Sequence, residues 1–156
     1  MTHELKFSEM LMRKAEQYVT QLGIPLVEKY SGTWDNMNLE RFNTMLKVSG
    51  AFEGFFMFSV DDSLAFSLVN LFLLEKISEN EISLYADKVV AEIANIIAGQ
   101  VFMDCEEANI MIHVPVNYRT NEITFKPNIE LRFIHSAKTE IGAFQCAFIR
   151  LSLIHI

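Results

Sequence analysis

The chain has few of the residues that mark several common classes of protein. Its two cysteines, Cys105 and Cys146, follow no CxxC or zinc-ligand spacing, so reduced thiols in a cytosolic protein are expected. Its 13 basic residues are outnumbered by 20 acidic ones. The resulting net charge of −7 argues against nucleic acid and anionic membranes as partners.

Long apolar runs are also missing. The best candidate, LAFSLVNLFLL at residues 64–74, is broken by Ser67 and Asn70. It falls short of the roughly 18 uninterrupted apolar residues that a membrane span needs. The N-terminal stretch MTHELKFSEM has no apolar region of the kind found in secretory signal peptides. We therefore expect a soluble, cytoplasmic protein.

The sequence contains no familiar metal or nucleotide motif. Its four histidines are scattered without HxH or HExxH spacing, and GxxxxGK[ST], GxGxxG and GxSxG are absent. We therefore expect neither a metal site nor a cofactor belonging to the chain itself.

Apolar side chains, in contrast, are plentiful. Of the 156 residues, 51% are apolar and 13 are phenylalanine, which excludes a disordered chain. A chain of this length is expected to form one domain, residues 1–156, that buries about two-thirds of its unfolded surface.

The N-terminal part of the chain predicts one amphipathic helix. Apolar residues recur at helical spacing over residues 3–22, and Gly23 and Pro25 end the pattern. Residues 24–41 keep no period, and a short strand over residues 26–28 is the only element they suggest.

The middle of the chain predicts a hairpin followed by two helices. Residues 43–60 read as two strands that turn near residues 52–54. The run Asp61-Asp62-Ser63 offers N-caps for a helix over residues 64–75. Ser78-x-x-Glu81 then forms the pattern of a capping box, which opens a long helix over residues 78–104.

After residue 107 the apolar period changes to two, which predicts three or four antiparallel strands. The candidate strands are residues 108–114, 122–126, 129–136 and 140–153, with a turn at residues 136–139. The last strand is apolar on both faces, which indicates either burial on both sides or a second subunit on one of them. We therefore expect a homodimer.

The order of these elements has no β-α-β alternation. The predicted fold class is therefore α+β, an antiparallel sheet with helices packed on it.

The helix over residues 78–104 carries one polar strip on an otherwise apolar surface. At roughly 100° per residue, Glu92 and Asn95 lie about 60° apart, and Lys88 and Gly99 fall in the same wedge. A glycine inside a helix costs about 1 kcal/mol relative to alanine. One reason to accept that cost is that Gly99 lets the backbone of another molecule approach Asn95 closely.

The run Glu92-x-x-Asn95-x-x-x-Gly99, in AEIANIIAG, resembles the signature of the CheC/CheX/FliY family of bacterial chemotaxis phosphatases. Proteins of this family act on the phosphoaspartate of a response regulator. The order of elements resembles the CheX domain over nearly the whole chain. A single copy of the motif points to the CheX branch, since the CheC branch has two.

The resemblance implies a role for each residue of the strip. Asn95 would orient the attacking water, and Glu92 would pair with a lysine of the receiver domain. The partner would supply that lysine and a Mg²⁺ ion. Gly99 would allow the close approach of the partner. Lys88 stands where the family often has Asp or Ser, which implies an altered contact with the partner.

Two other readings stay open. Lys88 favours a non-catalytic docking module on the same scaffold, which binds a receiver domain or a flagellar-switch component without hydrolysis. A strip of solvated polar residues on an oligomeric scaffold is the other reading. A phosphate-release assay separates a phosphatase from the docking module.

Overall fold

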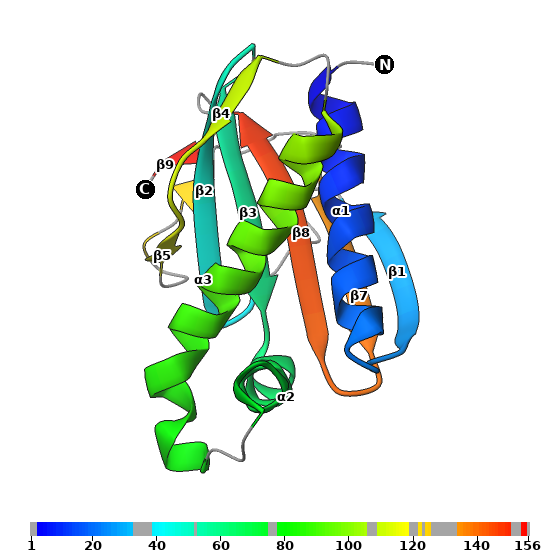
Figure 1. Cartoon of the computed structure of the whole chain (residues 1–156), viewed down its shortest axis with the longest axis vertical. Coiled ribbons are helices and arrows are strands. Elements are labelled where there is room, and N and C mark those ends of the chain that lie inside the picture. Colours follow the sequence, from blue (N-terminus) through cyan, green and yellow to red (C-terminus); the bar gives the residue numbers. More distant parts are fainter. Residues whose placement is uncertain are drawn as a thin grey trace.

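The computed structural model describes residues 3–32, 39–51, 53–74, 78–105, 109–118, 122, 124–125, 134–150 and 154–155. These residues form three helices, α1 (His3–Gln21), α2 (Asp62–Leu73) and α3 (Glu79–Asp104). Figure 1 shows the helices on one face of the main sheet, with α1 and α3 side by side. The predicted α+β class is therefore confirmed.

The main sheet has seven strands, all of whose pairings are antiparallel. Their order is β1-β7-β8-β3-β2-β4, and β5 also pairs with β2. The strands are β1 (Leu26–Gly32), β2 (Phe42–Gly50), β3 (Gly54–Val60), β4 (Ile110–Ile112), β5 (Val116–Tyr118), β7 (Ile134–Thr139) and β8 (Ala143–Arg150). A separate pair is formed by β6 (Thr124–Phe125) and β9 (Ile154–His155).

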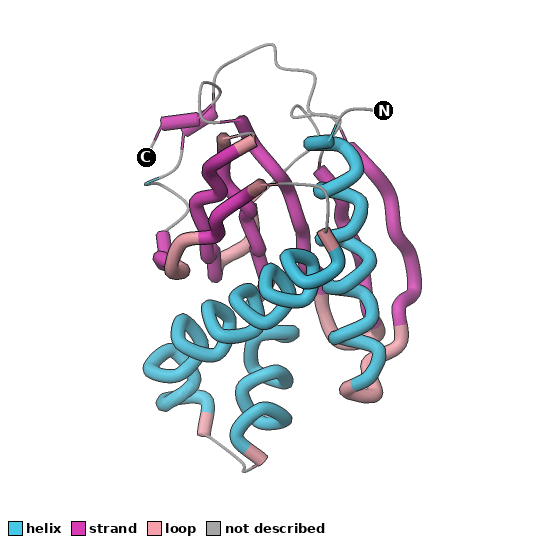
Figure 2. The backbone as a smooth tube through the Cα atoms, turned by 45° about the horizontal axis from the view of Figure 1, so that its top comes forward, coloured by secondary structure: helices cyan, strands magenta, loops and turns pink. Residues whose placement is uncertain are grey.

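Alternate residues of the central strands point toward the helices and form the main core. Phe56 and Phe58 of β3 are fully buried there, as are Phe144 and Phe148 of β8. Phe7 of α1 meets Phe148 edge to face, with 5.6 Å between the ring centroids, a geometry that aromatic pairs favour. Figure 2 shows the helices gathered on this side of the strands.

The opposite face of the sheet is buried as well. Met45, Met57, Ala147 and Ile149 are each at most 1% exposed and belong to a second apolar cluster on that face. Strand β8 lies between β7 and β3, and both of its faces are covered within one chain. Of the two alternatives for the apolar last strand, burial on both sides is therefore confirmed. The faces of β8 no longer give a reason to expect a dimer.

The two helices that follow the hairpin begin differently. Asp61 caps α2, because its Oδ1 accepts a hydrogen bond from the Leu64 N–H at 2.9 Å. Its Oδ2 accepts another from the Ala143 N–H at 2.8 Å, which ties the start of α2 to β8. Ser78 is the N-cap residue of α3, but its side chain makes no capping hydrogen bond, so the predicted capping box is wrong. The Glu81 N–H that a capping box would use donates instead to the Ser78 carbonyl oxygen at 2.9 Å.

The turn between the last two strands was predicted at residues 136–139, and this is wrong. Those residues belong to β7, and the turn lies at residues 140–142. Thr139 closes it: its N–H and its hydroxyl both donate to the Gly142 carbonyl oxygen, at 2.8 and 2.7 Å. Its Oγ1 also accepts from the Gly142 N–H at 3.0 Å. The side chain of the last strand residue therefore fixes where the chain reverses.

The other predicted elements agree in type. Strand β1 extends to Gly32, well beyond the predicted residues 26–28, and β5 was not predicted at all. The predicted strand over residues 129–136 is described only from residue 134 onward, where it forms β7, and residues 129–133 lie outside the described part. Of the helices formed by the described residues, none combines the length and apolarity needed to cross a membrane.

The double role of Asp61 gives a stability prediction. Asp61→Ala removes the helix cap and leaves the Ala143 N–H without its acceptor, so the free energy of unfolding should fall by about 1–2 kcal/mol. Urea denaturation measures this change. Asp62→Ala is the matched control, since Asp62 makes an exposed ion pair with Arg41, a kind of contact worth at most about 1 kcal/mol. Equal effects of the two substitutions would contradict the assigned role of Asp61.

Candidate functional site

Helix α3 packs on the sheet and against both other helices, so most of its circumference is covered. Its buried positions recur at helical spacing, as the sequence predicts for a core helix. They are Ala86, Val89, Val90, Ile93, Ala94, Ile97, Ala98 and Val101. What remains in contact with solvent over the middle of α3 is a narrow strip.

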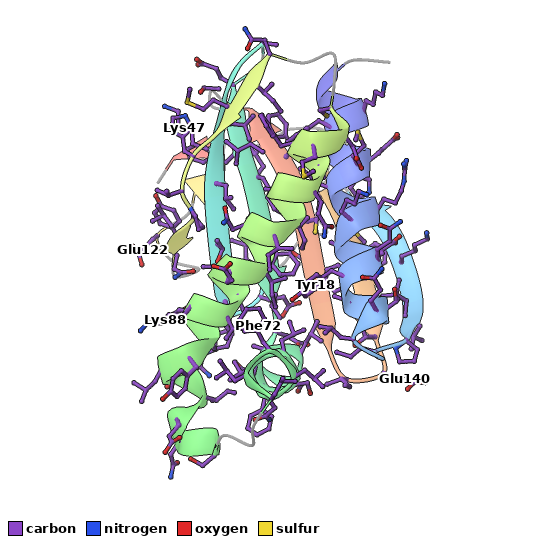
Figure 3. The ribbon with its side chains drawn as sticks, in the orientation of Figure 1. Tyr18, Lys47, Phe72, Lys88, Glu122 and Glu140 are labelled. Atoms are coloured by element: carbon purple, nitrogen blue, oxygen red, sulfur yellow. The ribbon has the colours of Figure 1, made fainter. Side chains whose placement is uncertain are left out.

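The four predicted site residues lie together on this strip. Lys88, Glu92, Asn95 and Gly99 are all exposed, on successive turns of one helix face. Figure 3 shows Lys88 pointing away from the other helices. The carboxylate of Glu92 and the carboxamide of Asn95 are therefore both exposed to solvent on the same face of α3.

Glu92 lies on the α1 side of the strip. The half-buried Tyr18 of α1 is close enough to be influenced by the Glu92 carboxylate: burial first, and then that negative charge, raise the pKa of the Tyr18 phenol. Tyr18 lies between α1 and α3 in Figure 3. An ion pair between Lys14 and Asp104, with a 2.9 Å contact, also joins the two helices. The Glu92 carboxylate is thus near enough to α1 to act electrostatically on Tyr18.

Asn95 lies on the opposite, β4 side of the strip. There it lines a groove of about 390 Å³ between the C-terminal half of α3 and strand β4. The lining residues are Asn95, Gly99, Phe102, Ile110, Met111 and Ile112. Among these described lining residues, the Asn95 carboxamide is therefore the one polar side chain.

In the described part of the chain, Glu92 and Asn95 have no side-chain hydrogen bond and no ion pair. The pair between Lys88 and Glu92 that their spacing allows is not formed. Both groups are exposed, and an exposed pair at this spacing gains only a few tenths of a kcal/mol. Both site side chains are free to meet a partner.

Gly99 leaves open space on the strip. A Cβ added at this position would meet no other atom within 4 Å, leaving aside the helix's own nearby backbone. The absence of a side chain is therefore not required by packing inside the molecule. The open space is compatible with the predicted close approach of another molecule at Gly99, which stays a prediction.

Sequence reasoning missed Tyr18, Phe102 and Met111 as neighbours of the site. Tyr18 is one of the residues that recur at helical spacing over residues 3–22, and Phe102 belongs to the apolar surface of the helix predicted over residues 78–104. Helical periodicity identifies the exposed face of α3, but it carries no information about which elements flank that face.

Among the described residues, no group of three or more His, Cys, Asp or Glu side chains is placed to hold a metal ion. Cys105 and Cys146 are free thiols, and burial raises the pKa of both. Buried thiols with raised pKa values are poor nucleophiles.

Several solved structures share the fold at low sequence identity. CheX from Vibrio vulnificus aligns with a TM-score of 0.69 and 15% identity, covering 92% of this chain and 99% of that one. A CheX–CheY–BeF₃–Mg²⁺ complex from Borrelia burgdorferi aligns with a TM-score of 0.68 and 14% identity, covering 97% and 99%. FliY from Thermotoga maritima aligns with a TM-score of 0.57 and 15% identity, covering 98% and 93%.

The sequence itself gives a family. No curated protein matches it in a direct sequence comparison. The family model described as chemotaxis phosphatase CheX, however, matches residues 42–136, which include the hairpin, α2, α3 and the strip with Glu92 and Asn95. That match spans more than half of the chain, and the chain belongs to the CheX family of chemotaxis phosphatases.

Proposed function

We propose that this protein hydrolyses the aspartyl phosphate of a response-regulator receiver domain. The observation that carries the proposal is that Glu92 and Asn95 are exposed, and unpaired among the described residues, on the core helix of a CheX-family chain. The Borrelia burgdorferi complex of CheX with CheY supports a receiver domain as the partner. The free thiols are compatible with a cytoplasmic protein.

The reaction requires little covalent chemistry from the phosphatase. A water oxygen attacks phosphorus, the bond between phosphorus and the aspartate oxygen breaks, and inorganic phosphate leaves with the water's protons. The loose transition state chiefly requires a water held in line and neutralisation of the phosphoryl charge. The receiver domain would bring its own Mg²⁺ and lysine for the second task, so this chain needs no cofactor.

Asn95 suits the first task. Its carboxamide oxygen can accept a hydrogen bond from the attacking water, while its N–H₂ group donates elsewhere, and neither changes protonation near neutral pH. Because the Asn95 side chain has no partner among the described residues, it can enter the receiver's site without breaking a bond of its own.

Glu92 suits the role of an anchor. Its carboxylate, about one turn before Asn95, can pair with the lysine of the receiver site in a charge-assisted hydrogen bond. Lys88, one further turn away and exposed, would meet acidic groups of the partner.

The first test is Asn95→Ala. It should remove nearly all acceleration of phosphoaspartate decay, because the water loses its orienting group, while the exposed position leaves the fold unchanged. Phosphate release from phosphorylated receiver domains of the same cell measures the effect. Asn80→Ala is the matched control, since Asn80 is exposed on the same helix about 22 Å away.

Glu92→Lys completes this test, because it should weaken docking rather than the maximal rate. If Asn95→Ala protein shortened the lifetime of the phosphorylated receiver as wild type does, the catalytic assignment would be wrong. If wild type bound the receiver without shortening its lifetime, the docking module that Lys88 favours would be the better description.

Gly99→Ala separates stability from function. The added methyl group meets open space, so the substitution should raise the free energy of unfolding by about 0.5–1 kcal/mol. It should nevertheless slow dephosphorylation at low protein concentration, because the methyl group stands where the partner's backbone approaches. Denaturation and phosphate release on the same preparation measure both effects. A variant that is more stable and equally active would remove the proposed role of Gly99.

We also propose a homodimer, on different grounds from the faces of β8. Strand β1 ends the sheet with one unpaired edge among the described residues, and its Val27 and Tyr30 are 66% and 44% exposed. Such an edge is a template for pairing with a second copy. Light scattering at micromolar concentration should give twice the chain mass of 17.9 kDa. The mass of a single chain would refute the dimer.

A further inference from the structure

The groove beside Asn95 lies between helix α3, which carries the site, and strand β4. Strand β4 pairs antiparallel with the end of β2, and just beyond that pairing the Ala51 N–H donates to the Asn109 carbonyl oxygen at 2.9 Å. Gly50 has φ of +112° and lies against the backbone of Asn109, so no Cβ fits there. The outer wall of the groove is therefore set by backbone contacts.

The groove is apolar and open. Phe102 of α3 is 48% exposed and Met111 of β4 is 62% exposed, and Val114 just after β4 is 78% exposed. Among the residues that the structure describes, none that lines the groove carries a charged side chain. Exposed apolar surface gathered in one depression usually marks a protein contact. A segment carrying an apolar side chain is the occupant that this chemistry accepts.

The size of a protein interface places the groove within the partner's footprint. Each partner in a stable interface covers about 800 Å², which is a patch roughly 16 Å in radius. Along α3, Asn95 and Phe102 are only about 10 Å apart. A receiver domain centred on Asn95 would therefore cover the groove. If no side chain of the receiver entered the groove, the area in contact would be smaller.

We propose that the groove takes an apolar side chain from the loops that surround the receiver's phosphorylated aspartate, and that it selects among receiver domains. This inference rests on the proposed function for the identity of the partner. In a doubly wound receiver fold the active site lies at the carboxyl ends of the strands, among such loops. Glu92 and Asn95 would then contact the active-site groups that all phosphorylated receivers share. The groove would contact a loop side chain that differs between receivers.

The test compares Met111→Asp with wild type. The probe is a CheY-type receiver domain of the same cell, loaded with BeF₃⁻ and Mg²⁺. Its dissociation constant, measured by fluorescence anisotropy, should rise about tenfold or more, since a buried apolar contact is replaced by a charge. In phosphate release, the concentration needed for half-maximal acceleration should rise in the same proportion, with little change in the maximal rate.

Two further variants make the result interpretable. Phe102→Ala removes apolar surface from the other wall without adding charge, and should weaken binding in the same direction. Ile141→Asp is the matched control, because Ile141 is 41% exposed in the turn between β7 and β8, at the far end of the sheet from β4. It should bind as wild type does.

The outcomes separate this inference from the proposed function. If Met111→Asp and Phe102→Ala bind the loaded receiver as tightly as wild type, the groove does not contact it and the inference is wrong. A change in the oligomeric state of these variants in place of a change in binding would assign the groove to a second copy, which also overturns it. If wild type binds but never shortens the phosphoaspartate's lifetime, the phosphatase fails while loss of binding by Met111→Asp still upholds the groove.

Discussion

The packing of helix α3 against the sheet is the interaction on which the rest of this molecule depends. Eight apolar side chains of the helix are at most 3% exposed, and burial of each larger one contributes about 1.5–3 kcal/mol. Because the helix is held around most of its circumference, its backbone rather than any local bond positions Glu92 and Asn95. Glu92 and Asn95, which have no hydrogen-bond or ion-pair partner among the described residues, are thereby held on one face of the helix.

The elements that the sequence could predict are those whose signal is local. The length and period of α3, the cap at Asp61 and the two strands of the hairpin are all encoded in neighbouring residues. Strand β5, in contrast, has only three residues, and its pairing with β2 rather than its own composition makes it a strand. The turn after β7 depends on hydrogen bonds of the Thr139 side chain. No typical turn dipeptide in the sequence predicts this turn.

The candidate site likewise contains residues that the sequence predicts and neighbours that it does not. Helical spacing was enough to place Glu92, Asn95, Lys88 and Gly99 on one strip, because a regular helix fixes the angles between its own residues. It could not reveal that Tyr18 flanks the carboxylate or that Met111 flanks the carboxamide. Those neighbours come from elements brought to α3 by the topology of the sheet, and no pattern within α3 records them.

The outer edge of β2 is shared by two short strands, with β4 on Val48–Gly50 and β5 on Asn43–Met45. Each ladder is only three residues long, and neither includes the helix that carries Asn95. A substitution at the exposed Met111 of β4 therefore leaves Glu92 and Asn95 on α3 unchanged. With the groove as the proposed partner contact, a lineage could exchange one signalling partner for another by mutating the groove's outer wall, while helix α3 stays the same.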